Sequence, residues 1–452
     1  MIFDARRAAL DTLNILDQGH DTLVYLIEAA VAEDAGVSRR DRAFIQALVF
    51  GVFRWRGRLD FIINHISSTR FDKIDPKVLN ILRMALFQII YLDRVPASAA
   101  VNTAVEIAKT TAAPWVVGFV NAVLRKAARD HQNLSFPAVD KDAVAATATA
   151  KSFPEWIIRR WTRRWGLEDT TTLCDALNTI PAITVRTNRL KTSPQDLMKA
   201  LGGEAEQIKP TLHSPDGITF VNPATSIPGL RTFKKGWFQV QDEAAQLVSL
   251  LLNPQPGDAV LDACAGLGGK TGHIAQLMKN EGSIVALDIN AQKLLRLESE
   301  MLRMGISIVK TSCRDLENKN LHRQFNPFDR ILLDAPCSGL GVMRRNPDIK
   351  WRTSKKNPIK FQVRQLGLLS NLSLLVKPSG LLVYAVCSPE PEENEDVVNE
   401  FLKKHAKFVI DKQFEGLSNK MRPIQAANGW FHTFPQFSYM DGFSFVRLKR
   451  TQ

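Results

Sequence analysis

Two cysteines and an aspartate stand where this sequence can place chemistry. The apolar run 331–333 predicts a buried strand that continues into Asp334 and then reaches Cys337. The run 381–386 predicts another strand, which leads directly into Cys387. In an open α/β sheet, ligands bind outside the carboxyl ends of the strands. One carboxylate and two thiols at that edge therefore predict an active site among the strand ends.

The chemistry that suits this set of groups is methyl transfer to a pyrimidine carbon. A thiolate adds to C6 of the ring, and the adduct makes C5 nucleophilic enough to attack a methylsulfonium. Loss of the C5 proton and elimination of the thiol complete the reaction, and Asp334 suits the acid needed near N3. For one cysteine alone, a buried structural thiol is the better explanation. Two thiols favour catalysis, although the residues alone do not decide whether Cys337 or Cys387 is the nucleophile.

A glycine loop precedes these strands in the chain. The stretch 260–271 predicts a strand, a loop with three glycines and the start of a helix. Its spacing matches neither the dinucleotide GxGxxG pattern nor the phosphate loop GxxxxGK[ST]. The next predicted strand ends in Asp288, an acid that either hydrogen-bonds a ribose diol or caps the following helix. Together these features favour an adenosine cofactor, and S-adenosylmethionine fits, with Asp262 near its amino-acid portion.

Composition narrows the class of protein. The 452 residues carry 59 Lys and Arg against 46 Asp and Glu, which suits RNA as a partner or describes a solvated basic surface. The first residues lack the apolar core of a signal peptide, and no apolar run is long enough to span a bilayer. Five cysteines without a CxxC pair argue against a disulfide framework and against a metal site. We expect a cytoplasmic protein without membrane partners, and nothing in the sequence demands more than a monomer.

The pattern of apolar residues predicts a multidomain chain. Residues 1–130 read as an all-α bundle, and 131–150 as a linker. Residues 151–235 predict a small α+β module, and 236–452 alternate strands with helices. That alternation predicts a doubly wound, mostly parallel sheet of the Rossmann-like α/β class.

Arginines near aromatic residues or near the predicted site are candidate RNA contacts. Arg54 and Arg56 flank a tryptophan, and Arg344 and Arg345 follow the loop that contains Cys337. Guanidinium groups and aromatic rings grip phosphates and stack on bases. A solvated basic helix end is the alternative explanation. The same two explanations, RNA contact or sheet surface, apply to Arg186 and Asn188.

Longer motifs surround the candidate residues. They are Asp334-Ala-Pro-Cys-Ser-Gly339, residues 341–351, and Tyr384-Ala-Val-Cys-Ser388 with Pro391-Glu-Glu-Asn394. These motifs, with 237–242 and 441–445, resemble the RsmB/NOP family of RNA cytosine-C5 methyltransferases. The first 130 residues resemble the NusB-like RNA-binding domain, through 41–44, 52–54, 95–102 and 120–125. The resemblance covers nearly the whole chain.

The resemblance implies roles that the residues alone leave open. It implies that Cys387 is the nucleophile and that Cys337 assists product release. It implies S-adenosylmethionine as the cofactor and small-subunit (16S) ribosomal RNA, free or in an assembly intermediate, as the partner. The implied cofactor contacts are Asp262, Cys264, Ala265, Gly266, Gly268, Gly269, Lys270, Asp288, Asp315 and Asp334.

The chain departs from the family pattern at three places. Leu267 replaces a proline in the glycine loop, and Val386 replaces a threonine before Cys387, which predicts the loss of one hydroxyl from the site. The third acid on the cofactor side has no clean match, and Asp315 is the nearest residue. Lys270 is expected near the methionine carboxylate or the polar network of the site, or else in solvent.

Three functions remain to be separated. The leading one is S-adenosylmethionine-dependent methylation of cytosine C5 in 16S ribosomal RNA through a covalent cysteine–C6 adduct. The alternative is a non-catalytic RNA-binding ribosome-assembly factor that retains the fold, which a cofactor-binding assay would distinguish. A methyltransferase acting on an exocyclic amine is the third, and it typically has Asn/Asp-Pro-Pro-aromatic where this chain has Asp-Ala-Pro-Cys.

Overall fold

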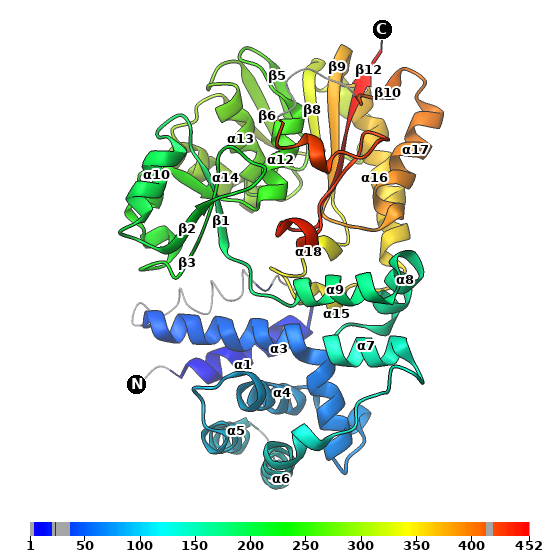
Figure 1. Cartoon of the computed structure of the whole chain (residues 1–452). Helices are drawn as coiled ribbons and strands as arrows, with labels where there is room; N and C mark the ends of the chain where they lie inside the picture. The colour runs from blue at the N-terminus through cyan, green and yellow to red at the C-terminus, as the bar shows by residue number, and fades with distance from the viewer. Residues whose placement is uncertain (1–3, 20–22, 24–36, 112, 413–418, 452) are drawn as a thin grey trace. The chain divides into compact units, whose positions relative to one another are not determined.

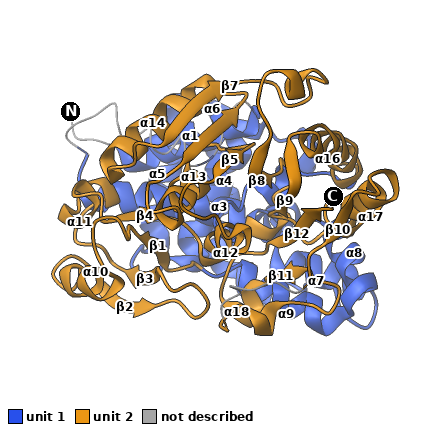
Figure 2. Ribbon diagram, turned by 90° about the horizontal axis from the view of Figure 1, so that it is seen from above, with its two compact units in different colours: residues 1–179, 343–355 blue, residues 180–342, 356–452 orange. Residues whose placement is uncertain are grey.

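The chain forms two compact units (Figure 2). The computed structural model describes residues 4–19, 23, 37–111, 113–412 and 419–451. Unit 1 comprises Met1–Thr179 and Met343–Lys355, and unit 2 comprises Ile180–Val342 and Lys356–Gln452. A short segment from the second half of the chain therefore folds with the first.

Unit 1 is helical in its described residues, as the sequence predicts (Figure 1). Its main helices are α1 Ala5–Asp17, α3 Arg39–Ile66, α4 Pro76–Tyr91, α5 Ala97–Thr111, α6 Pro114–Asp130, α7 Ala143–Lys151, α8 Glu155–Trp165, α9 Leu167–Leu177 and the short α15 Ile349–Arg352. The single-turn helices are η1 Phe71–Lys73 and η2 His131–Asn133.

Local capping explains where the first helices begin. The carboxylate of Asp4 accepts hydrogen bonds from the backbone at the start of α1, and the Ser38 hydroxyl does the same for α3. Asp75 caps α4, and Pro76 occupies its first turn, where a missing N–H costs nothing. Each of these helices therefore begins at a side chain that satisfies N–H groups of its first turn.

The division into units falls later than the predicted linker. Helix α7 begins within the segment 131–150, and α8 and α9 belong to unit 1. The buried face of α8 explains this, because Ile157, Ile158 and Trp161 need an apolar partner and the Trp161 ring packs against Phe153. The boundary between the two compact units lies at Thr179.

The segment 343–355 packs against the helices of unit 1. The Lys350 side chain is fully buried, and its Nζ donates hydrogen bonds to Asn178 Oδ1 and to the carbonyl oxygens of Arg54 and Ser152. Trp351 donates from Nε1 to the Phe53 carbonyl oxygen at 2.7 Å. These bonds tie the segment to α3 and to the end of α7.

Unit 2 contains a small antiparallel sheet, which agrees with the predicted α+β module. Its strand order is β2-β3-β1-β4. The elements are β1 Ile183–Thr187, α10 Pro194–Leu201, β2 Glu206–Pro210, β3 Gly217–Val221, η3 Ile227–Gly229, α11 Arg231–Lys234 and β4 Phe238–Val240. Residues such as Val185, Phe220 and Phe238 form its apolar core.

The larger sheet of unit 2 has the order β10-β12-β9-β8-β5-β6-β7, with β11 beside β12. The strands from β7 to β9 in this order run parallel to one another. Strand β12 pairs antiparallel with β9, and β10 and β11 each pair antiparallel with β12. The predicted mostly parallel, doubly wound sheet is confirmed. The strands are β5 Ala259–Asp262, β6 Ser283–Asp288, β7 Val309–Cys313, β8 Phe328–Asp334, β9 Val376–Val386, β10 Phe408–Ile410, β11 Phe431–His432 and β12 Ser444–Arg450.

Helices cover both faces of this sheet, because successive strand residues point to opposite sides. Val260 packs in the core under α12, α13 and α14, whereas its neighbour Leu261 packs in the core under α16 and α17. The helices are α12 Glu243–Leu252, α13 Gly269–Leu277, α14 Ala291–Met304, α16 Asn357–Ser373, α17 Glu395–Lys404 and α18 Pro435–Ser438. The single-turn helices are η4 Leu321–Arg323, η5 Leu340–Val342, η6 Pro391–Glu393 and η7 Arg422–Ile424.

Strand β7 begins at Val309, shortly after α14 ends at Met304. The residues after Gly305 close the end of α14, because Ile306 N donates to the Met301 carbonyl oxygen. The order of the strands reverses between β5 and β8, and open α/β sheets bind ligands at such a reversal, outside the carboxyl ends of the strands.

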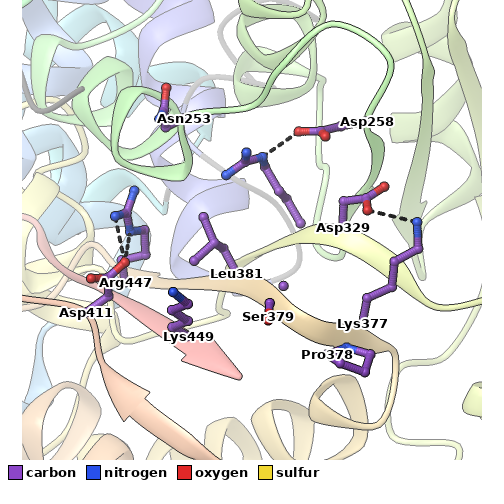
Figure 3. Close-up of a pocket in the computed structure, with 12 residues that line it drawn as sticks. Asn253, Asp258, Asp329, Lys377, Pro378, Ser379, Leu381, Asp411, Arg447 and Lys449 are labelled. Atoms are coloured by element: carbon purple, nitrogen blue, oxygen red, sulfur yellow. Dashed lines mark hydrogen bonds and ion pairs between the residues drawn. The ribbon is translucent and has the colours of Figure 1, made fainter. Parts of the chain in front are cut away.

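A hollow of about 570 Å³ lies at the opposite, amino-terminal edge of the parallel strands (Figure 3). Its acids are neutralised by ion pairs between Arg330 and Asp258, Lys377 and Asp329, and Arg447 and Asp411. Paired charges at this edge do not make a reaction centre.

Among the described residues, no helix is both long and apolar enough to cross a membrane.

Candidate active site

The two predicted site cysteines lie beside each other. Strands β8 and β9 run parallel with Asp334 opposite Ala385, so the residues that follow their ends emerge together. The sulfur atoms of Cys337 and Cys387 are 3.0 Å apart, and both side chains are half-buried. The structure thus brings together the two thiols that the sequence predicted at separate strand ends.

Burial and the neighbouring thiol change the acidity of Cys337. The hydrogen bond with Cys387, reinforced by burial, raises the pKa of Cys337 well above its ordinary value. Cys337 therefore keeps its proton at neutral pH. In the contact between the two sulfur atoms, either atom can be the donor.

Asp334, at the end of β8, pairs with Lys270 in the first turn of α13. Lys270 Nζ lies 2.6 Å from Asp334 Oδ2, and the lysine side chain is 12% exposed. Burial lowers the pKa of Lys270, but the Asp334 charge and hydrogen bond outweigh it, so the pKa is raised overall. The Lys270 ammonium also lies 5.2 Å from the centre of the Phe443 ring. Lys270 therefore lies in the polar network of the site rather than in solvent.

Asp262 ends β5 and is almost fully buried. Its Oδ2 accepts a hydrogen bond of 2.6 Å from the Thr271 hydroxyl, while its Oδ1 has no hydrogen-bond partner among the described residues. Burial raises the pKa of Asp262 to about 6, although the Thr271 bond opposes the shift. A buried carboxylate oxygen without a donor is costly unless a ligand satisfies it.

The glycine loop wraps around Asp288 at the end of β6. Gly266 N donates to Asp288 Oδ2 at 3.0 Å, and Asn290 N donates to Oδ1 at 2.8 Å. Gly266 has φ +57°, and a Cβ added to it would face open space. Gly268 has φ +83° and packs so closely on α14 that an added Cβ would lie 2.6 Å from Leu297 Cγ. At Gly266 the loop therefore exposes its backbone to open space, and at Gly268 it packs tightly against α14.

Comparisons with known proteins agree with this architecture. The profile of the 16S rRNA methyltransferase RsmB/F family matches residues 249–449. The NusB family matches residues 4–129, and the ferredoxin-like domain of RsmF/B-like methyltransferases matches 153–226. The probable ribosomal RNA small subunit methyltransferase B of Bacillus subtilis is 32% identical over 98% of both chains. The chain belongs to the RsmB/F methyltransferase family.

Solved structures support the fold of this RsmB/F family member. The crystallised protein PH0851 covers all of both chains with a TM-score of 0.83 at 24% identity. A methyltransferase homologue from Pyrococcus horikoshii is 26% identical, with a TM-score of 0.59, and covers 68% of this chain and 99% of its own. These likenesses confirm the three-part fold: a NusB-like helical part, a ferredoxin-like sheet and a Rossmann-like catalytic part.

The cofactor of this family member is S-adenosylmethionine, and the residues at the crevice fit it. The unpartnered Oδ1 of Asp262 is an acceptor for an ammonium group. Each oxygen of Asp288 accepts one backbone N–H and retains a lone pair for a ribose hydroxyl. The open side of Gly266 leaves room for a ligand against the backbone.

The other predicted cofactor residues differ in their surroundings. Ala265 and Gly269 lie in the same loop and its helix start, where Ala265 N pairs with the Leu287 carbonyl oxygen of β6. Cys264 packs on the apolar core, and burial raises the pKa of its thiol, as befits a structural cysteine. Asp315 is exposed after β7, and its carboxylate accepts from Glu317 N in its own turn. Its cofactor contact stays a prediction.

The departure at Val386 places an apolar side chain beside the site. Val386 is fully buried in the apolar core under α16 and α17, and Cys337 packs against the same core. The loss of one hydroxyl from the site at this position stays a prediction. Leu267 is half exposed in the glycine loop.

Two of the four predicted RNA contacts are buried. Arg54 is 5% exposed and donates from Nη2 to the Arg344 carbonyl oxygen, and Arg344 is 6% exposed. A phosphate does not reach guanidinium groups that are buried this deeply in unit 1. The predicted RNA contacts of Arg54 and Arg344 are therefore wrong. Arg56 is half-buried and forms a 2.8 Å ion pair with Asp17, and Arg345 is half-buried.

Arg186 and Asn188 are also buried, and neither faces RNA nor the sheet surface. Arg186 is fully buried and donates to the Gly269 carbonyl oxygen at 2.6 Å, and Asn188 donates to the Met304 carbonyl oxygen at 2.8 Å. Both brace the small sheet against the helices of the cofactor side. Their polarity alone did not reveal this role, because burial depends on tertiary packing.

Sequence reasoning also missed one acid close to the thiols. Glu393, in η6, is fully buried and accepts hydrogen bonds from Ser338 and Ser388. These serines directly follow Cys337 and Cys387. The signal was present in the Pro391-Glu-Glu-Asn394 motif, but nothing in it indicated which residues the acid would contact.

Proposed function

We propose that the protein transfers a methyl group from S-adenosylmethionine to C5 of a cytosine in small-subunit ribosomal RNA, through a covalent bond between Cys387 and C6. The observation that carries the proposal is the contact between the Cys337 and Cys387 sulfur atoms, close to the Lys270–Asp334 pair. The names of the relatives support small-subunit RNA as the substrate. Such a reaction belongs in the cytoplasm.

The proposed roles follow from the protonation of these groups. The Cys387 thiol first loses its proton to solvent, because the thiolate is the nucleophile. The Cys387 Sγ anion then attacks C6, and the electron pair of the 5,6 double bond moves toward the ring carbonyl and N3. Bound S-adenosylmethionine supplies the methyl group for C5. Lys270 keeps its proton beside Asp334, so the ammonium, rather than the acid expected at Asp334, stabilises the charge at N3.

Cys337 acts after the methyl group has been transferred. Its raised pKa rests first on the hydrogen bond with Cys387, and that cause disappears when Cys387 Sγ is bonded to carbon. Cys337 then loses its proton to solvent and takes the proton from C5. The C5–H electrons restore the double bond as the Cys387–C6 bond breaks, and the product leaves.

A denaturation-resistant protein–RNA adduct tests this proposal. Wild type, Cys337→Ala and Cys387→Ala would each receive S-adenosylmethionine and unmodified small-subunit RNA, with Cys313→Ser as the control. We expect Cys337→Ala to accumulate the adduct and Cys387→Ala to form none. Digestion of the RNA should yield 5-methylcytidine rather than N4-methylcytidine from wild type and the control.

Other outcomes lead to other conclusions. An adduct that accumulates in Cys387→Ala would exchange the roles of the two thiols. Methylation that survives both substitutions would exclude the covalent mechanism. A wild type that binds the cofactor but modifies neither RNA nor assembling subunits would favour the non-catalytic assembly factor.

A further inference from the structure

The two segments that carry the thiols are joined by a single carboxylate. Ser338 and Ser388 each donate their hydroxyl to Glu393 Oε2 at 2.5 Å, and Ser338 N donates to Oε1 at 2.7 Å. The two hydroxyl oxygens are 3.2 Å apart. Because each serine is the covalent neighbour of one thiol residue, any movement of Glu393 is transmitted to both cysteines.

Burial strengthens the hydrogen bonds between Glu393 and the two serines. Glu393 and Ser388 are fully buried, and Ser338 is 8% exposed. Burial raises the pKa of Glu393, while the bonds from Ser338 and Ser388 oppose the shift. Hydrogen bonds to an acid in a dry environment are short and costly to break, since the freed groups find no water to replace the lost partner.

Glu393 itself is held by an element outside the two strand ends. It closes η6 Pro391–Glu393, where its N–H donates to the Glu390 carbonyl oxygen. Tyr384 Oη, from β9, donates to the Glu393 carbonyl oxygen at 2.6 Å. The backbone of Glu393 is thus held by contacts that involve neither serine.

The strand ladder does not explain the position of the thiols by itself. The pairing of β8 with β9 ends at Asp334 and Ala385, and Cys337 lies three residues beyond. The loop after β8 therefore needs a separate restraint to bring Cys337 Sγ to within 3.0 Å of Cys387 Sγ. The bonds from Gly341 N to the Cys387 carbonyl oxygen and from Gln365 Nε2 to the Pro336 carbonyl oxygen hold this loop through its backbone. The Glu393 carboxylate is the group that bonds to the residue next to each thiol.

We propose that Glu393 is a positioning residue that sets the separation of the Cys337 and Cys387 sulfur atoms, acting through Ser338 and Ser388. Its catalytic consequence rests on the proposed function, but the separation itself does not. Glu393 contacts neither the substrate nor the cofactor in this role. A displacement of about 1 Å in a reacting group costs on the order of a hundredfold in rate.

The first test measures the separation without any reaction on RNA. Diamide, an azo oxidant that takes two electrons and two protons, converts two adjacent thiols into a disulfide. The rate of the Cys337–Cys387 cross-link, followed by peptide mapping, reports how closely the sulfur atoms are held. We expect Glu393→Gln, Ser338→Ala and Ser388→Ala to form it at least about tenfold more slowly than wild type.

Glu392→Gln is the matched control, because it alters the adjacent glutamate of the same turn. It should cross-link at the wild-type rate. Thermal unfolding and binding of S-adenosylmethionine verify that each variant is folded. If Glu393→Gln does not fold, the two serine variants decide, since each removes one bond and leaves the acid in place.

The second test distinguishes the effect of Ser338 on catalysis from that of Ser388. Ser388→Ala should slow adduct formation, because Cys387 is misplaced, and Ser338→Ala should let the adduct accumulate, because Cys337 is misplaced. The KM for S-adenosylmethionine should stay unchanged while kcat falls. A general loss of structure would change both constants and would not distinguish the two serines.

The outcomes are distinct from those that test the methylation itself. Cross-linking at the wild-type rate in all three folded variants would overturn the positioning role, even if 5-methylcytidine is formed. Slower cross-linking in these variants would support it, even if wild type proves inactive on RNA.

Discussion

At the scale of single residues, protonation states distinguish groups of the same kind. Cys337 and Cys387 are both half-buried thiols, yet the pKa of Cys337 is raised by its neighbour. Asp262 and Asp334 both end strands, but one has an unpartnered oxygen and the other holds an ammonium group. The sequence predicted all four residues as site members, whereas their different states depend on contacts that only the fold creates.

The pKa of Asp262 predicts a pH dependence of cofactor binding. Burial raises it to about 6, and only the ionised form attracts the ammonium of S-adenosylmethionine, so affinity should fall as the pH falls through 6. Lowering the pH from 7 to 5 should weaken binding roughly tenfold, since about a tenth of the group is then ionised. Calorimetric titration measures this, and Asp262→Asn should bind weakly with no such dependence. A wild-type affinity that is equal at both pH values would contradict the assignment.

Replacing Lys270 tests the charge placed beside Asp334. Lys270→Met keeps the apolar stem but removes the ammonium that lies 2.6 Å from Asp334 Oδ2. We expect kcat for RNA methylation to fall by about 10²–10³, as when one donor to a developing anion is lost. Lys403→Met, on the exposed face of α17, is the control and should retain activity. An unchanged kcat in Lys270→Met would remove the lysine from the mechanism.

At the scale of elements, local signals were readable and contacts between segments were not. The caps at Asp4, Ser38 and Asp75 lie within a few bonds of the helices they start, so the sequence contains the whole cause. The burial of Arg54 depends on a carbonyl group about three hundred residues away, at Arg344. The contacts of Glu393 depend likewise on two strands that must first pair.

A glycine crossing links the loop after Cys337 to the segment before β12. Gly341 N donates to the Cys387 carbonyl oxygen at 3.0 Å, and Gly442 N donates to the Gly341 carbonyl oxygen at 2.8 Å. A Cβ on Gly341 would overlap the Gly442 carbonyl group, which forces the segments apart. The absence of side chains at this crossing is therefore a requirement of the site.

Gly341→Ala should lower the stability of unit 2 by about 1–3 kcal/mol, the usual cost of overpacking. It should also slow adduct formation, because the Cys387 carbonyl is pushed away. Gly367→Ala, in α16, is the opposite case, since a Cβ there meets nothing within 4 Å. It should raise stability by up to about 1 kcal/mol through helix propensity. Urea unfolding of both variants gives the comparison, and equal midpoints would contradict it.

At the scale of the whole molecule, chain order and folding units do not coincide. Residues 343–355 belong to unit 1, although the segments on both sides of them belong to unit 2. The sequence assigned this stretch to the catalytic part, because it continues the motif that starts at Asp334. Its buried Lys350 carried no signal of this, since a lysine is normally a surface residue.

Lys350→Met should destabilise unit 1 in the full-length chain. It leaves Asn178 Oδ1 and the carbonyl oxygens of Arg54 and Ser152 without their donor, at a cost of about 2–3 kcal/mol. Hydrogen exchange should rise in α3, α7 and α9 and stay unchanged in β5 and β8. The exposed Lys355 provides the control variant Lys355→Met, which should exchange like wild type. Exchange that rises equally in both units would contradict this assignment.

The late position of residues 343–355 in the chain also delays the completion of unit 1 during synthesis. The helices of unit 1 leave the ribosome by residue 179, but the segment that completes their core follows only at residue 355. At about 5–20 residues per second, the nascent helices wait roughly ten to thirty-five seconds for it. During that interval the groups that bind Lys350 and Trp351 lack these partners. A stall in translation between these two points would leave an incomplete N-terminal unit exposed to proteolysis.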